Sequence, residues 1–175
     1  MRRVFFALFI LVFASNFVYG GDEERLKSLI KFSQVSGEFN QTKRLKAFKN
    51  PLISRGIFKI YDNTFEQNTT TPFKTAIKVD KNGVFEYKNG QFEKIRSNFD
   101  EELFLAIFTL DFKKLQKNFN YEISFDDGWS VVLKPVGIIS KVFTKIEISG
   151  KEYVSKIRLC ETNGDETLYN FFNIK

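Results

Sequence analysis

The chain has 175 residues, with 22 phenylalanines, one cysteine, no histidine and a formal net charge of +6. The absence of histidine excludes the commonest general base, the commonest metal ligand and every serine–histidine or cysteine–histidine catalytic pair, and one cysteine excludes an internal disulfide. Because the basic residues are spread along the chain rather than gathered in a stripe, the sequence indicates no nucleic-acid partner, and no metal or cofactor is expected.

The first twenty residues have the pattern of an export signal. Two arginines precede an apolar run at residues 4–13, and residues 18–20 (Val-Tyr-Gly) suit a cleavage site. The run is shorter than the roughly 20 apolar residues that a membrane span requires, which makes a membrane anchor the weaker alternative. We therefore expect residues 1–20 to be a signal peptide, removed after Gly20, and residues 21–175 to form a single exported domain.

Residues 22–34 place Leu26, Leu29 and Ile30 on one helical face, which predicts a first helix. From residue 36 the apolar period changes to two, and turn signals such as Asn82-Gly83 follow at short intervals. This pattern is typical of an antiparallel meander. The predicted strands are residues 37–47, 53–61, 65–68, 73–80, 84–87, 92–96, 121–125, 129–135, 143–149, 152–160 and 167–174.

Residues 100–119 interrupt the strands with apolar side chains at helical spacing. They predict one or two short helices. Asp100 is the expected N-cap of the first, and Asp111 is a candidate cap for the second.

Several predicted strands have one apolar and one polar face. Ile146 and Ile148, for example, alternate with Lys145, Glu147 and Ser149. Such alternation predicts a sheet with one dry face. Two interpretations stay open: the sheet curls and fills its interior with its own side chains, which the pattern alone favours, or the interior is partly open for an apolar ligand.

Seven short segments follow one another in an order known from one protein family. They are FNQT at 39–42, LISRGIF at 52–58, PF at 72–73, DFKKL at 111–115, WSVVLKP at 129–135, IEI at 146–148 and NGDET at 163–167. In these segments, and in its signal and length, the chain resembles the LolA-like periplasmic carriers of outer-membrane lipoproteins. The resemblance implies a mainly β fold with an α lid: an unclosed antiparallel β-barrel of about eleven strands covered by short helices.

The resemblance also implies a function. A LolA-like carrier shields the acyl chains of a lipoprotein, or of a related lipid or glycolipid, in a hydrophobic cavity. It receives this cargo from an inner-membrane ABC transporter and passes it to an outer-membrane acceptor. The expected protein is thus a periplasmic monomer and not an enzyme.

The resemblance shifts the interpretation of the interior toward an open cavity. The residues expected to line it share the dry face of the strands or the apolar face of the lid. They are Phe58, Ile60, Phe73, Ile77, Val79, Phe85, Trp129, Val131, Leu133, Ile146, Ile148, Ile157 and Leu159 from the strands, and Phe104, Ile107, Phe108 and Phe112 from the lid.

The chain departs from the family at Asp62. Classical carriers have an arginine near the end of the second long strand that hydrogen-bonds to the lid, and the matching stretch, residues 60–65, has Asp62 there.

Two alternative functions remain: a lipid-sensing periplasmic regulator of envelope stress, which shares the fold, and an exported hydrolase using Asp126 and Asp127. The hydrolase is disfavoured because these two carboxylates open a hairpin turn, where acids are common.

Overall fold

A computed structural model gives the fold for residues 19–32, 34–96 and 100–175. The predicted signal peptide lies outside these residues, except that Tyr19 and Gly20 begin the backbone of the first helix. The helices are α1 (Tyr19–Leu29), α2 (Glu101–Thr109), α3 (Phe112–Leu115) and the short 3₁₀ helix η1 (Ile139–Lys141). The strands are β1 (Val35–Arg44), β2 (Leu52–Tyr61), β3 (Thr64–Thr71), β4 (Thr75–Asp80), β5 (Gly83–Lys88), β6 (Gln91–Lys94), β7 (Phe119–Ser124), β8 (Trp129–Pro135), β9 (Phe143–Gly150), β10 (Val154–Glu161) and β11 (Glu166–Phe172).

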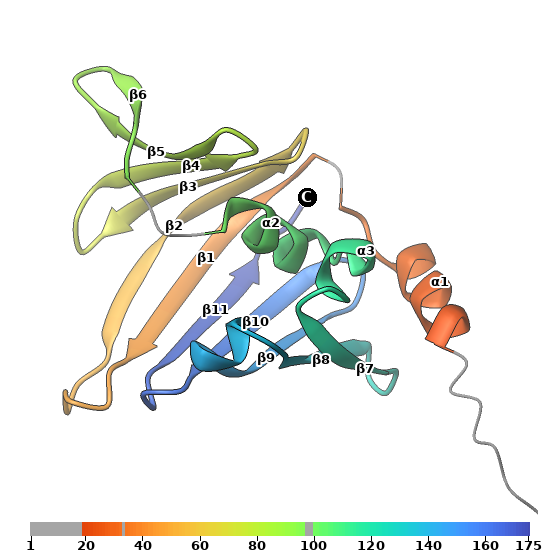
Figure 1. Cartoon of the computed structure of the whole chain (residues 1–175). Helices are drawn as coiled ribbons and strands as arrows, with labels where there is room; N and C mark the ends of the chain where they lie inside the picture. Colours follow the sequence, from red (N-terminus) through yellow and green to blue (C-terminus); the bar gives the residue numbers. More distant parts are fainter. Residues whose placement is uncertain (1–18, 33, 97–99) are drawn as a thin grey trace, which may run out of the picture.

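All eleven strands form one antiparallel sheet. Its order is β6-β5-β4-β3-β2-β1-β11-β10-β9-β8-β7. Strands consecutive in the chain are neighbours in the sheet except β6 and β7, which are its two edges, and β1 pairs with β11. The sheet curves strongly, but β6 and β7 remain separate edges and the barrel does not close (Figure 1). The predicted unclosed antiparallel barrel is confirmed.

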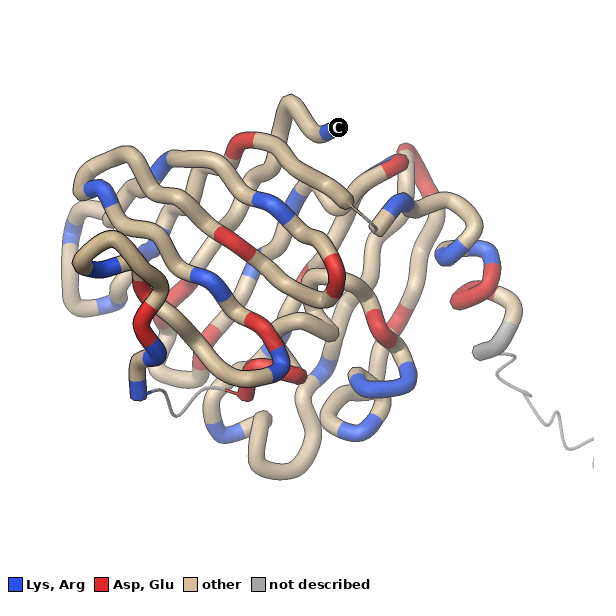
Figure 2. The backbone as a smooth tube through the Cα atoms, turned by 90° about the horizontal axis from the view of Figure 1, so that it is seen from above, with Lys and Arg blue, Asp and Glu red and all other residues tan. Residues whose placement is uncertain are grey.

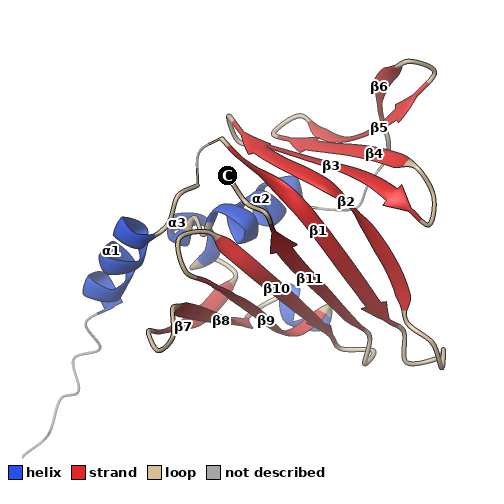
Figure 3. Ribbon diagram, turned by 180° about the vertical axis from the view of Figure 1, so that it is seen from behind, coloured by secondary structure: helices blue, strands red, loops and turns tan. Residues whose placement is uncertain are grey.

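The helices lie on the concave side of the sheet. α2 and α3 cross its hollow, whereas α1 packs beside the β7 end (Figure 3). Asp100 caps α2 as predicted, because its carboxylate accepts the Leu103 backbone N–H at 2.9 Å. Asp111 occupies the cap position of α3, but its side chain makes no capping hydrogen bond.

The first helix begins and ends earlier than its sequence pattern predicts. α1 spans Tyr19–Leu29 rather than residues 22–34. Leu26 is fully buried, and the Arg25 guanidinium lies 3.9 Å from the centre of the Phe125 ring. After the helix, the Lys31 backbone N–H donates to the Glu152 carbonyl at 2.9 Å, before β1 begins at Val35.

The half of the sheet nearest β7 encloses a dense core. Five residues of β8, β9 and β10 have no exposed surface at all. They are Val131, Leu133, Ile146, Ile148 and Ile157. Phe112 of α3 closes this core from above, with its ring centre 5.0 Å from that of Tyr121. Here the interior is filled by the chain's own side chains.

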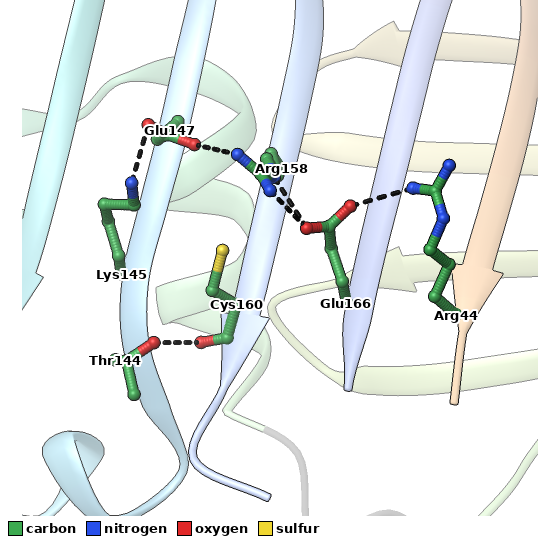
Figure 4. A network of polar contacts seen from close by, with 7 residues as sticks. All are labelled: Arg44, Thr144, Lys145, Glu147, Arg158, Cys160 and Glu166. Atoms are coloured by element: carbon green, nitrogen blue, oxygen red, sulfur yellow. Dashed lines mark hydrogen bonds and ion pairs between the residues drawn. The ribbon is translucent and has the colours of Figure 1, made fainter. Parts of the chain in front are cut away.

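Charged residues of both signs are distributed along the strands (Figure 2). A chain of ion pairs crosses four strands (Figure 4). Arg158 donates from Nη1 to Glu147 at 3.2 Å and from Nε to Glu166 at 2.8 Å, and Arg44 donates to the other oxygen of Glu166 at 3.0 Å. Lys145 lies 2.9 Å from Glu147. These pairs link β9, β10, β11 and β1 side by side.

We expect Arg158→Met to lower the free energy of unfolding by about 1 kcal/mol at pH 7, because the pairs are partly exposed. The hydrogen bond from Arg158 lowers the pKa of the Glu166 carboxyl, and the hydrogen bond from Lys145 lowers that of Glu147. A carboxyl whose pKa is lowered on folding stabilises the protein above its ordinary pKa, and this stabilisation is lost as the pH falls through the lowered pKa.

The loss caused by Arg158→Met should therefore shrink below about pH 4, near the ordinary carboxyl pKa. Urea unfolding at pH 7 and pH 3 measures both effects. Lys151→Met is the matched control, since its partner Asp127 is 94% exposed, and it should change little at either pH. An equal loss at both pH values would mean that Arg158 acts through the packing of its aliphatic stem alone.

Candidate functional site

A cavity of about 370 Å³ lies on the concave side of the sheet, in the half away from the dense core. It is bounded by α2 and by β1, β3, β4, β5 and β11. Its lining residues are Gln41, Phe65, Gln67, Ile77, Val79, Val84, Phe104 and Tyr169. The volume is near the lower end of the range of about 300–1,000 Å³ found for small-molecule sites.

Strand register places these side chains on one face. Val79 of β4 pairs with Phe65 of β3 on one side and with Val84 of β5 on the other. Residues directly opposite each other in neighbouring strands point to the same face of a sheet. Ile77 pairs in the same way with Gln67. The period-two alternation of β3 and β4 therefore builds the cavity wall.

Aromatic contacts hold α2 over the sheet. The Phe65 ring lies 5.2 Å from that of Phe104 and 4.6 Å from that of Phe108, measured between centres. Phe108 also contacts Phe171 of β11 at 6.0 Å. Rings packed at these distances bury a large apolar surface between α2 and the sheet.

One end of the cavity is polar but uncharged. Gln41 Nε2 donates to the Tyr169 hydroxyl at 2.8 Å, and Gln67 Nε2 donates to the Thr69 hydroxyl at 3.2 Å. Burial raises the pKa of Tyr169 to about 12, so its phenol stays protonated near neutral pH. Amide and phenol groups of this kind can hydrogen-bond to a carbonyl or hydroxyl of a ligand whose apolar part contacts the rest of the wall.

The structure divides the residues predicted to line a cavity into groups. Ile77, Val79 and Phe104 line the open cavity. Phe58, Ile60 and Phe108 face the concave side at a separate gap of only about 20 Å³. The others on this face lie in or against the packed core, without a place at the open cavity. They are Ile107, Phe112, Trp129, Val131, Leu133, Ile146, Ile148, Ile157 and Leu159.

Neither Phe73 nor Phe85 lines the cavity, contrary to prediction. Phe73 precedes β4 and is 77% exposed, because the strand begins only at Thr75. Phe85 pairs with Lys78, whose Nζ lies 4.5 Å from the centre of its ring. The turn between β4 and β5 places Val84 opposite Val79, so Val84 points to the concave face. Because successive side chains of a strand alternate, Phe85 points to the convex face.

Asp62 lies in the turn between β2 and β3 rather than in a strand. Its φ is 46° and that of Asn63 is 55°, and Tyr61 pairs directly with Thr64 across this two-residue turn. Positive φ at both central residues is the geometry of a tight hairpin, which Asp and Asn tolerate. Asp62 is exposed there. Asp62 therefore helps to form the hairpin. The contacts described above between α2 and the sheet are aromatic instead.

A family model described as outer membrane lipoprotein carrier protein LolA matches residues 30–175. The chain belongs to the LolA family. Proteins of this family are carriers or binders of lipids and lipoproteins rather than enzymes. Among curated proteins the sequence has no match.

Solved structures resemble this LolA-family chain at low sequence identity. A LolA superfamily protein from Nitrosomonas europaea has 9% identity and a TM-score of 0.50, with 87% of this chain and 90% of that chain covered. A structure of the Pseudomonas aeruginosa MucA/MucB complex has 8% identity and a TM-score of 0.49, and the match covers 88% of this chain and 55% of that chain. The likeness to the Nitrosomonas protein is one of fold.

Sequence reasoning missed five residues of the LolA-like cavity: Gln41, Phe65, Gln67, Val84 and Tyr169. The alternation around residue 65 could have indicated Phe65. Gln41 and Tyr169 meet only through the pairing of β1 with β11, which are far apart in the chain.

In the described part of this chain, no three Cys, Asp or Glu side chains gather as potential metal ligands, and no helix is long and apolar enough to cross a membrane.

Proposed function

We propose that this protein is a periplasmic carrier that shields the acyl chain of a lipoprotein, or of a related lipid or glycolipid, between the inner and the outer membrane. The observation that carries the proposal is the cavity of about 370 Å³ between α2 and the sheet, with Phe, Ile and Val on its wall. Membership of the LolA family supports it. An inner-membrane ABC transporter as donor and an outer-membrane protein as acceptor complete the proposed route, with the carrier acting as a monomer.

The physical need for such a carrier is large. Burial stabilises each methylene of an acyl chain by about 0.8 kcal/mol relative to water, or about 12 kcal/mol for a chain of roughly 15 methylenes. A wall of Phe65, Ile77 and Val79 offsets much of this cost with few directional contacts, so the chain can slide onward to a more apolar acceptor. A carrier of this kind needs no catalytic group.

The size of the cavity also bears on the cargo. At about 370 Å³ it suits a single chain or part of one. Lipids with several acyl chains would require the aromatic contacts of Phe65 with Phe104 and Phe108 to open and α2 to move away from the sheet. We propose that α2 is the moving lid.

Titration with a pyrene-labelled fatty acid tests the proposal directly. We expect saturable binding of one probe per protein, with displacement by unlabelled palmitate. Native mass spectrometry of protein purified from the periplasm should show an acylated species bound to it. Absence of saturable binding together with ligand-free protein from the periplasm would contradict a carrier role.

Gln41→Leu should weaken binding of a pyrene-labelled fatty acid methyl ester about fivefold, because a single neutral hydrogen bond contributes about 1 kcal/mol. Binding of the corresponding labelled alkane, which has no carbonyl, should not weaken. Gln116→Leu, at an exposed position after α3, is the control and should change neither. Equal weakening of ester and alkane would mean that Gln41 contributes only to packing.

A further inference from the structure

Three loops meet at the end of the sheet where β1 and β10 finish (Figure 1). The Lys46 backbone N–H, after β1, donates at 2.8 Å to Asp165 in the β10–β11 turn. The Thr162 backbone N–H in that turn donates at 2.9 Å to the Val142 carbonyl beside η1. The β1–β2 loop, the β10–β11 turn and the η1 loop therefore form one continuous edge.

This edge exposes five large apolar side chains, which we call the apolar rim. Phe48 is 66% exposed, Leu52 57% and Ile53 47% on the β1–β2 loop and the start of β2. On the η1 loop, Ile138 is 74% exposed and Val142 49%. Single exposed apolar residues are common on soluble proteins, but a group of them from two loops joined at one end of a sheet is typical of an interaction surface.

Exposed lysines accompany the apolar rim. Lys46 and Lys49 lie in the β1–β2 loop, and Lys141 lies in the η1 loop. Asp165 of the adjoining turn has both carboxylate oxygens engaged, one with the Lys46 backbone and the other with Asn163 at 3.0 Å. Against these three lysines the adjoining turn has two carboxylates, Glu161 and Asp165, so the edge carries a small net positive charge together with apolar side chains.

The rim continues the face that lines the cavity. Gln41 is a cavity residue, and Lys43, two residues further along β1, points to the same face of the sheet. Lys43 pairs directly with Leu52 of the rim. A ligand leaving the cavity along this face would pass Leu52.

We propose that the apolar rim docks the protein on an anionic lipid surface. Apolar side chains on separate loop tips, with lysines between them, can enter the interfacial zone of a bilayer while the ammonium groups contact anionic head groups. These apolar side chains lie on two separate loops rather than forming the flat, continuous patch that a stable protein interface of about 1,600 Å² requires. The occupant that fits both the shape and the charge is a membrane.

Co-sedimentation with vesicles of phosphatidylglycerol and phosphatidylethanolamine tests the proposal, using protein purified from the periplasm. We expect binding to these vesicles, at least tenfold weaker binding to purely zwitterionic vesicles, and weakening as salt is raised. The double variant Phe48→Ser with Ile138→Ser should bind at least tenfold less, as should the triple variant of Lys46, Lys49 and Lys141 to Gln.

Leu29→Ser and Tyr87→Ser are matched controls, because both residues are about half exposed and lie on α1 and β5, away from the rim. Equal losses in these controls, equal binding to zwitterionic vesicles, or no vesicle binding would overturn the proposal. So would rim variants that bind the anionic vesicles as tightly as the natural sequence does. Acyl-probe binding is measured in parallel. Rim variants should retain it, so failure of membrane docking and failure of the carrier function are distinguishable.

Discussion

Replacing Ile148 with glutamate should unfold the protein rather than merely impair ligand binding. Ile148 has no exposed surface and lies between Val131 of β8 and Ile157 of β10 in the sheet register, both also fully buried. A carboxylate at this position has neither water nor a cation beside it, because the lysines and arginines of these strands point to the convex face. The expected loss exceeds about 4 kcal/mol, a large part of the typical 5–15 kcal/mol stability of a domain.

Urea unfolding followed by circular dichroism measures this loss. The matched control is Ser149→Glu, one residue further along β9, which points to the convex face beside Lys156. That change should alter the free energy of unfolding by less than about 0.5 kcal/mol. A folded Ile148→Glu protein with nearly unchanged stability would mean that this half of the interior is open enough to admit water.

The sheet could be predicted from the sequence because its signals are local. The alternation that follows Asp127-Gly128 and ends at Pro135 predicts β8 with its observed bounds, Trp129–Pro135. Most strands are short, have one dry face and end at a turn, and within β1–β6 and within β7–β11 consecutive strands pair in chain order. The resulting meander leaves little freedom in topology once the turns are recognised.

Which part of the dry face is open could not be predicted, because it depends on contacts distant in the chain. Val131 and Val79 have the same sequence pattern, but Val131 lies in the packed core and Val79 lines the cavity. Contacts with the helices differ between the two halves: α3 packs on the β7 half through Phe112 and Tyr121, whereas α2 contacts β3, β4 and β11 beside the cavity.

Errors at single residues have similar causes. The apolar strand predicts that Phe85 points to the interior. The face to which Phe85 points depends instead on the length of the preceding turn, which pairs Val79 with Val84. Gln41 and Tyr169 look like surface residues in the sequence. They belong to the dry face because β1 and β11, at opposite ends of the chain, become neighbours. Polar residues on a dry face are therefore the positions to examine for a ligand site.

Ile77→Lys should abolish acyl-chain binding while leaving the protein folded. Ile77 is half-buried in the cavity wall, and its direct neighbour on β5, Glu86, carries a carboxylate on the same face. Glu86 already pairs with Lys88 at 2.7 Å, and a lysine at position 77 can share this carboxylate, which limits the cost to stability. The added ammonium group would lie at the wall of the space proposed for an acyl chain. Transfer of apolar methylenes beside a charge is strongly unfavourable, so affinity for the pyrene-labelled fatty acid methyl ester should fall at least 100-fold.

Ala76→Lys provides the control for this change. Ala76 is the preceding residue of β4, is also half-buried and points to the convex face opposite Asn68 of β3. It should bind the probe with unchanged affinity, and both variants should unfold within about 1 kcal/mol of the natural sequence. If Ile77→Lys bound the probe as well as Ala76→Lys does, the space between α2 and β4 would not be the binding site. The acyl chain would then have to enter elsewhere, and the small gap beside Phe58 and Ile60 would need to expand, since at about 20 Å³ it cannot hold one.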